Sequence, residues 1–354
     1  MTRHIFRRII QSIPTIFGVT ILSYLIMTAA PGGPAALLTF GNIDDENNIQ
    51  RQQIEERYGL NDPWIMQYVT WVAGNDWQVW KNRTIINEDG EEELVFRHTT
   101  QGVIRGDFGE SFRQRRPALD IILERVPATL ELGIASLLVA LLVGIPIGIV
   151  AAIWHGGIFD NTSRILAVVG NAIPNFWFGL MLILFVGVFL DQPWARGNRC
   201  DLSANSRTGC GSVPIYQRME YLLLPTFVLA YGGIANFSRF MRTSMLDTVS
   251  SDFIRTAYAK GLRNRTVWWR HAARNSLIPI ATFLGPAIVG VIGGSAITEA
   301  IFTWPGLGRV FVESISSRDY PVVMASVLIA SLLTVVGYII SDILYAVFDP
   351  RIRF

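Results

Sequence analysis

The sequence predicts an all-α, polytopic membrane protein that crosses the bilayer six times. Of its 354 residues, 51% are hydrophobic and only 16% are charged, and the mean hydropathy is +0.36, which is too apolar for an ordinary water-soluble protein. The apolar residues are gathered into runs of about 20, the length that a helix needs to cross about 30 Å of hydrocarbon. Each run must be helical, because lipid offers no partner to a free backbone N–H or C=O group.

Six such runs divide the chain into spans and loops. They extend over about Ile9–Ala30, Ala128–Trp154, Ile165–Leu190, Leu222–Phe240, Leu277–Ile297 and Val322–Phe348. The fourth run is the least regular, because a proline, two glycines and Asn236 dilute it. We therefore expect an N-terminal cytoplasmic segment with the first span over 1–30, an external loop subdomain over 31–126, and a membrane core over 127–354.

Basic residues near the span ends place both termini in the cytoplasm, since arginine and lysine accumulate in cytoplasmic loops. The N-terminus carries Arg3, Arg7 and Arg8, and the loop 241–276 carries six arginines and Lys260 against two aspartates. An even number of spans returns the C-terminus to the same side. The loops over 31–126, 191–220 and 299–321 then face outward.

The N-terminal stretch also has features of a secretory signal peptide, namely Arg7-Arg8, an apolar run and then Thr28-Ala29-Ala30. Two observations oppose cleavage. Pro31 directly follows the small residues, and the apolar run has the full length of a span. We therefore expect this segment to remain as the first span.

The sequence offers no catalytic or metal centre, so the chain is predicted not to be an enzyme and to bind no cofactor. Its two lysines, Lys81 and Lys260, lie in Trp-Lys-Asn and Ala-Lys-Gly, whereas a phosphate-binding loop requires Gly-Lys-Ser/Thr. There is no His-Glu-x-x-His motif and no assembly typical of a metal site or a catalytic triad. The histidines are scattered over the termini and loops, at His4, His98, His155 and His271.

Ionisable residues are rare within the spans, which disfavours a proton- or sodium-coupled carrier or an ion channel. Glu131 lies near the outer end of the second span, Arg239 near the inner end of the fourth, and Asp342 in the inner half of the sixth. We interpret Asp342 as a buried carboxylate bonded to a neighbouring helix or to Arg351. The energy for any transport should therefore come from outside this subunit.

The segment FIRTAYAKGL in the cytoplasmic loop after the fourth span predicts a short helix over about Phe253–Lys260. Ser250, Ser251 or Asp252 can cap its start, and Gly261 suits the left-handed position that ends a helix. A second helical piece is expected to start at Asn264 or Thr266. Ala257 and Ala259 leave a low-profile surface and the nearby arginines can bind carboxylates, which favours a docking element. The alternative is a basic collar that only anchors to anionic lipid.

The sequence allows more than one interpretation of several loop features. Cys200 and Cys210 are the only cysteines and share one outward loop, so they form either a disulfide or two free thiols. The turn containing Trp304, Pro305 and Gly306 is either an external gate or a plain extracellular turn. The remaining expectations are a polar helical region over 44–72, a β-hairpin over 84–97 that turns near Asp89-Gly90, and a close-approach helix face at Gly144 and Gly148.

The chain resembles the first, B-type permease of the dipeptide and oligopeptide family of binding-protein-dependent ABC importers. The resemblance covers nearly the whole length. It is carried by RRIIQSIPTIFGVTILSYLIMTAAPGGP, IEERYGLNDPWIMQY, GDFGESF, DFIRTAYAKGL, RHAARNSLIP, ITEAIFTWPGLGRVF, SRDYPVV and DILYAVFDPRIRF. It implies the type I importer permease fold in the inner membrane of a prokaryote. Residues 75–101 look like an insertion relative to the usual family loop, and the resemblance assigns them no role.

The same resemblance implies how the subunit works. ATP and magnesium are bound by two partner ATPase subunits, a second homologous permease completes the path, and an extracytoplasmic binding protein delivers peptides; no nucleic acid is involved. The loop 241–276 is then the coupling segment, with candidate residues Arg255, Thr256, Ala257, Lys260 and Gly261. Only Ala257 and Gly261 match the general importer motif, because Arg255 stands where its glutamate is usual. The Leu-Pro expected from this motif is likewise reduced to Ile278-Pro279, at a longer distance from the glycine.

Two alternatives remain open from the sequence. The cargo could instead be a nickel complex, glutathione or an oligosaccharide, carried by a member of the same family. The chain could also be a membrane scaffold without transport activity. The external subdomain is either a contact surface for the binding protein and the entering substrate or a packed cap without a contact role.

Overall fold

The computed structural model describes most of the chain and divides it into two compact units. The described residues are 2–29, 55–56, 59, 61–75, 83–86, 92–95, 99–196, 215–293 and 295–348. Unit 1 comprises Met1–Arg8, Pro127–Arg309 and Leu333–Phe354, and unit 2 comprises Ile9–Val126 and Val310–Leu332. Unit 1 therefore holds most of the predicted membrane core. Unit 2 holds the predicted external loop together with parts of the first and last spans.

Long apolar helices carry the predicted spans. They are α1 (Thr2–Ala29), α6 (Val126–Ile153), α9 (Ile215–Val249), α12 (Ala273–Gly293) and α15 (Tyr320–Phe348). Among the described residues, five helical stretches are long and apolar enough to cross a bilayer. The bent pair α7 (Ile158–Ala172) and α8 (Asn175–Leu182), which continues as η4 (Ile183–Phe189), makes a sixth when it is counted as one span. The six predicted spans are thus confirmed.

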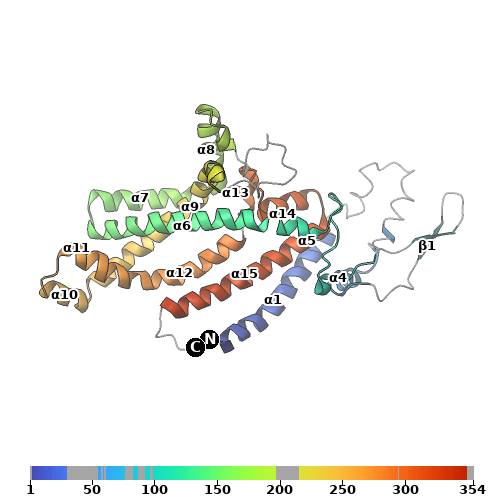
Figure 1. The fold of residues 1–354 in the computed structure, drawn as a ribbon, viewed down its shortest axis with the longest axis horizontal. Coiled ribbons are helices and arrows are strands. Elements are labelled where there is room, and N and C mark those ends of the chain that lie inside the picture. Colours follow the sequence, from blue (N-terminus) through green and yellow to red (C-terminus); the bar gives the residue numbers. More distant parts are fainter. Residues whose placement is uncertain are drawn as a thin grey trace. The chain divides into compact units, whose positions relative to one another are not determined.

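The third span is broken near its middle, whereas the sequence predicts one continuous helix over Ile165–Leu190. The axes of α7 and α8 differ by 99° (Figure 1). Pro174 explains the break, because proline lacks a backbone N–H and disfavours helical geometry in the residue before it. That residue, Ile173, is extended at φ −80° and ψ 123°. The span is therefore two half-helices joined at an extended residue.

Within unit 1, α7 and α12 pack along α9, and the short helices α10 (Asp252–Ala259) and α11 (Asn264–Thr266) lie together at one end of these helices (Figure 1). Two glycines of α6 face α9. A Cβ atom at Gly144 would lie 2.9 Å from the carbonyl oxygen of Ile234, and one at Gly148 would lie 2.6 Å from the Cβ of Met241. The predicted close-approach face is confirmed, and any larger residue there would push the two helices apart.

A buried ion pair joins α7 to α9. The carboxylate of Asp160 lies 2.5 Å from Nε and 2.8 Å from Nη2 of Arg242, and it also accepts the backbone N–H of Gly156 at 2.9 Å. The Asp160 side chain is 1% exposed and that of Arg242 is 16% exposed. Two parallel charge-assisted bonds of this kind fix the orientation of both side chains.

We expect Asp160→Asn to lower the free energy of unfolding by about 3 kcal/mol, because Arg242 would be left as a buried charge without its carboxylate. Heating the purified protein in detergent and measuring the surviving monodisperse fraction tests this. The matched control is Glu124→Gln, which breaks the exposed pair with Arg116 and should change stability far less. Equal losses in the two variants would contradict the prediction.

Within unit 2, a buried hydrogen bond joins α1 to α4 (Trp64–Ala73). The hydroxyl groups of Thr20 and Tyr68 lie 2.8 Å apart, and both side chains are buried. A second link joins the loop before α5 (Ala118–Leu123) to the residue before α15: the Ser111 hydroxyl donates to the Asp319 carboxylate at 2.5 Å. These buried polar contacts hold segments together that are far apart in the sequence.

The predicted β-hairpin is present as β1 (Arg83–Ile86) and β2 (Glu92–Val95), which pair antiparallel with Ile86 opposite Glu92. Its predicted turn at Asp89-Gly90 lies outside the described residues, as does most of the predicted polar helical region 44–72. The remaining short elements are η3 (Val103–Arg105), η5 (Pro193–Arg196), η7 (Val267–Ala272), α13 (Ala296–Ile301) and α14 (Leu307–Ser316).

Candidate functional site

The predicted helix in the loop after the fourth span is present as α10. It follows Ser251, whose extended backbone (φ −75°, ψ 154°) is typical of an N-cap, and it ends before Lys260. Gly261 comes next with φ +76°, a left-handed conformation that only glycine adopts without steric cost. The second helical piece starts at Asn264, as predicted. One detail differs, because the Ser251 hydroxyl donates to the Thr248 carbonyl oxygen instead of accepting a helix N–H.

Helix α10 has one buried face and one open face. Ile254 and Ala257 are 1% and 7% exposed, and both belong to the hydrophobic core of unit 1. The sequence places Ala257 on a surface open to a partner, and this placement is wrong because the side chain faces the protein interior. The open face consists of Asp252, Phe253, Arg255, Thr256, Tyr258 and Ala259, and it continues into Lys260 and Gly261.

The open face of α10 combines aromatic and basic groups. Phe253 and Tyr258 are 45% and 39% exposed. Arg255 lies 3.5 Å from the carboxylate of Asp252, but both side chains are so exposed that this pair contributes little to stability. Aromatic rings beside basic groups are typical of the energetically important part of a protein interface. The face therefore suits a partner that offers an apolar groove edged with carboxylates.

Hydrogen bonds attach the base of this loop to two long helices. The Ser276 hydroxyl of α12 donates to the Thr248 hydroxyl of α9 at 2.9 Å, and the Ser244 hydroxyl of α9 donates to the Ser276 carbonyl oxygen at 2.9 Å. Val267 of η7 is buried in the same core as Ile254 of α10. The loop is therefore attached to α9 and α12 by hydrogen bonds, and α10 is attached to it by core packing.

The Trp304 turn, between α13 and α14, is packed inside unit 1. Trp304 is 0% exposed, and its indole Nε1–H donates to the carbonyl oxygen of Ala128 in α6 at 2.8 Å. Gly306 is also buried, and Pro305 is partly buried. The three gate candidates are thus neighbours in a packed turn anchored to α6, which differs from a plain exposed turn. The gating role itself stays a prediction.

A buried carboxylate that the sequence does not single out organises this turn. Glu299 is 1% exposed and accepts the Thr129 hydroxyl and the backbone N–H of Arg309, each at 3.1 Å. Thr129 in turn accepts the backbone N–H of Leu307 at 2.8 Å. A Cβ atom at Gly306 would lie 2.6 Å from the Thr129 hydroxyl oxygen, so only glycine fits. The available signal was a lone acidic residue in an apolar stretch followed by a glycine-containing turn.

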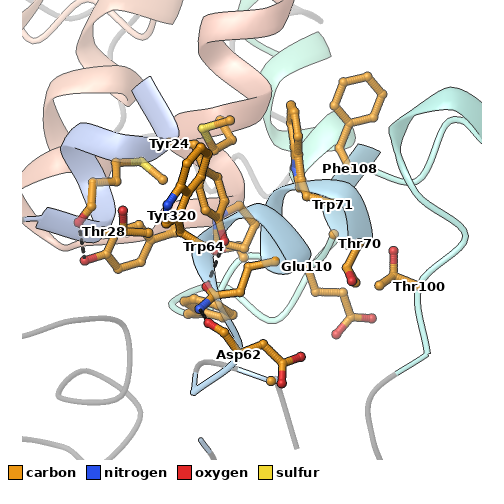
Figure 2. Close-up of a pocket in the computed structure, with 18 of the residues that line it drawn as sticks. Tyr24, Thr28, Asp62, Trp64, Thr70, Trp71, Thr100, Phe108, Glu110 and Tyr320 are labelled. Carbon is orange, nitrogen blue, oxygen red and sulfur yellow. Dashed lines mark hydrogen bonds between the residues drawn. The ribbon is translucent and has the colours of Figure 1, made fainter. Parts of the chain in front are cut away.

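Unit 2 contains a pocket of about 450 Å³, lined by residues of α1, α4, the loop before α5 and the start of α15 (Figure 2). Its walls are rich in aromatic side chains, including Tyr24, Trp64 and Trp71. Asp62 and Glu110 add carboxylates to the lining. Aromatic surface with a few polar groups is typical of a binding pocket. A pocket with this lining is suited to contact a peptide or a protein loop.

The remaining predictions concern Asp342, metal binding and the two cysteines. Asp342 of α15 bonds to Arg8 of α1, with 2.9 Å between Oδ2 and Nε, which confirms the predicted bond to a neighbouring helix. The carboxylate is only partly buried, with its side chain 17% exposed. In the described part of the chain, no group of three or more His, Cys, Asp or Glu side chains could hold a metal ion. Cys200 and Cys210 lie outside the described residues, so the disulfide stays a prediction.

Comparison with known proteins gives matches over the full length. Residues 144–354 match the family described as binding-protein-dependent transport system inner membrane component, and residues 1–87 match its N-terminal part. Over 355 residues, the chain is 40% identical to the oligopeptide transport system permease protein AppB of Bacillus subtilis (strain 168), covering 100% of both chains. It is 33% identical over 369 residues to the dipeptide transport system permease protein DppB of Escherichia coli (strain K12), covering 100% of this chain and 99% of DppB.

A solved structure shares the fold. A chain of the MetNI methionine ABC transporter in an inward-facing conformation superposes with a TM-score of 0.50 and 17% sequence identity. The match covers 66% of this chain and 97% of that chain. At this identity the likeness supports the architecture alone, which is that of an ABC importer permease.

Proposed function

Because the chain belongs to the family of binding-protein-dependent transport system inner membrane components, we propose that it is the permease subunit of an ABC importer for di- or oligopeptides. The observation that carries the proposal is the match over the full length to an oligopeptide permease at 40% identity. The chain is a multi-pass protein of the inner membrane. Peptides are preferred as cargo because both permeases compared above are named for peptide transport.

The division of labour follows from what this chain contains. The sequence has no phosphate-binding loop, so ATP and magnesium would be bound by two separate ATPase subunits. A second, homologous permease would complete the path, and an extracytoplasmic binding protein would deliver the peptide. Closure of the ATPases on ATP would stabilise one of two permease conformations, which is how transport proceeds without chemistry in this subunit.

The proposed contact with the ATPase is the open face of α10. Phe253 and Tyr258 would enter an apolar groove, while Arg255 and Lys260 would meet carboxylates at its edge. Ala257 and Gly261 would act indirectly, since Ala257 packs α10 onto the core and Gly261 sets where the helix ends. The bonds from Ser276 to α9 would then convey the movement of α10 to the spans.

We further propose that the pocket of unit 2 contacts the binding protein or the entering peptide. Its aromatic walls and the carboxylates of Asp62 and Glu110 suit such a contact. The Trp304 turn would be the external gate, because Glu299 and Thr129 hold it against α6.

The test is uptake by the reconstituted complex of this permease with its partner permease, ATPases and binding protein. We expect ATP-dependent accumulation of labelled di- and oligopeptides in vesicles, and none when the ATPases carry a substitution that blocks hydrolysis. Glutathione, a nickel chelate and an oligosaccharide serve as competing cargoes. Uptake of one of these without peptide uptake would replace the cargo assignment, and loss of all uptake with an intact complex would favour a scaffold.

A further inference from the structure

A polar cluster in the membrane part of unit 1 has no explanation in the packing of this chain. Asn171 of α7 donates to the side-chain oxygen of Asn236 in α9 at 3.2 Å, and Arg239 donates to the same oxygen at 3.1 Å. All three side chains are exposed. We call these three residues the polar patch.

The polar patch lies within the predicted spans, towards the inner end of the fourth. Asn171 is two residues before the break at Ile173 in the bent third span, Asn236 lies in the predicted fourth span Leu222–Phe240, and Arg239 lies near the inner end of that span. Exposed amides and a guanidinium at this depth are costly against lipid tails, so polar side chains in spans face a bundle interior or a water-filled cavity. The patch must therefore face something other than hydrocarbon.

The remaining surface of α7 indicates which side faces lipid. Leu166 is 64% exposed and Val169 is 47% exposed, and helical geometry places both on the side of α7 opposite Asn171. The helix is therefore amphipathic, with an apolar side suited to lipid and a polar side beside α9.

A cavity of about 180 Å³ adjoins the patch, between α6, α7 and α9, and three arginines line it. They are Arg164, Arg239 and Arg242. Asp160 neutralises Arg242, but among the described residues no carboxylate pairs with Arg164 or Arg239. Only one N–H of the Arg239 guanidinium group is used in a side-chain hydrogen bond within that part of the chain. Arg239 belongs both to the polar patch and to the lining of the cavity, and its guanidinium group, with Arg164 in the same lining, is chemically suited to bind a carboxylate.

We propose that the polar patch and its arginine-lined cavity face the translocation path and bind the terminal carboxylate of the passing peptide. The proposal rests on the proposed function, because every linear peptide with a free C-terminus carries this group. The site would be occupied transiently: Arg239 and Asn236 bind the carboxylate, and water replaces it when the peptide leaves. An anionic lipid headgroup is the competing source of negative charge, and the second test distinguishes it from a peptide carboxylate.

The first test measures whether the polar patch is accessible to water while the apolar side of α7 is not. In the assembled complex with Cys200 and Cys210 replaced by serine, Asn236→Cys and Val169→Cys are exposed to a membrane-impermeant, anionic methanethiosulfonate from the cytoplasmic side without nucleotide. We expect rapid modification of Asn236→Cys and little of Val169→Cys, the matched residue on the apolar side. Equal modification of both, or none at Asn236→Cys in any nucleotide state, overturns the proposal.

The second test measures the preference for negative charge. In Asn171→Cys, the ratio of modification rates for an anionic and a cationic reagent should fall roughly tenfold when Arg239→Gln is added. Arg113→Gln, which removes an exposed arginine from unit 2, should leave the ratio unchanged. A millimolar free-acid peptide should slow the anionic reagent, whereas the amidated peptide should not.

Each result of these tests either supports the proposed carboxylate site or contradicts it. An unchanged ratio in Arg239→Gln, or equal protection by the acid and the amide, overturns the carboxylate assignment. If the ratio instead depends on the content of anionic lipid in the vesicles, the ligand is a lipid headgroup, and this result also overturns the assignment to a peptide carboxylate. The labelling rates do not require uptake, so a complex that fails to import peptides would refute the proposed function without affecting the assignment of a wet, anion-selecting surface.

Discussion

Trp304→Ala is expected to destabilise the permease by about 3 to 5 kcal/mol, the range for truncating a fully buried tryptophan. The loss has two parts. The side chain is 0% exposed and packs in a small core with Ala128 and Leu132 of α6, so its removal leaves a cavity. The carbonyl oxygen of Ala128 also loses the indole N–H that it accepts at 2.8 Å.

Thermal inactivation of the purified protein, followed by size-exclusion chromatography after heating, measures this effect. Trp177→Ala is the matched control, because Trp177 is 47% exposed and its removal leaves no buried cavity. Trp304→Phe separates the two parts of the loss, since it keeps most of the volume and removes only the hydrogen bond. If Trp304→Ala melts no lower than Trp177→Ala, the packed turn is not a structural element of the folded chain.

The spans could be predicted because each depends only on the residues within its own segment of the sequence. The length of an apolar run and the thickness of hydrocarbon are enough to place six crossings, and the capping pattern around Ser251 and Gly261 is enough to place α10. The break in the third span was missed although Pro174 is visible in the sequence. A proline in a membrane helix often only bends it, so the sequence did not distinguish a kink from a 99° turn.

The long-range contacts could not be predicted, because their cause is tertiary. Thr129 and Glu299 are 170 residues apart, and neither has a local pattern that indicates a partner. The orientation of α10 was also beyond the sequence: Ala257 could lie on either face of an eight-residue helix, and only the core around Ile254 decides it. The polar patch likewise became apparent only when Asn171 and Asn236 proved to be in contact.

These differences change how the coupling segment should be tested. A substitution at Ala257 would disturb the attachment of α10 to unit 1, because the side chain is buried with Ile254 in the hydrophobic core. A charge there would therefore reduce folding and coupling together, and the two effects could not be separated. The open face offers a cleaner position, since Phe253 is 45% exposed and is not part of that core.

We expect Phe253→Asp to leave the folded permease intact and to reduce peptide-stimulated ATP hydrolysis by the assembled complex roughly tenfold or more, as for loss of an aromatic hot spot. If α10 contacts the ATPase as proposed, an aspartate would enter the apolar groove of that partner without a group to pair its charge, and the contact would be lost. The measurements are retention of the ATPase subunits on the tagged permease and the rate of ATP hydrolysis with binding protein and peptide present.

Two variants make this outcome specific. Phe253→Tyr keeps the ring and should retain most of the stimulation, whereas Ala257→Asp should lower the melting temperature of the isolated permease as well as the ATPase rate. Phe253→Asp should lower only the ATPase rate, because the Phe253 side chain is 45% exposed and is not a member of the hydrophobic core. Full retention of the ATPases with normal stimulated hydrolysis in Phe253→Asp would show that the motor engages a different surface, and α10 would then be a structural helix alone.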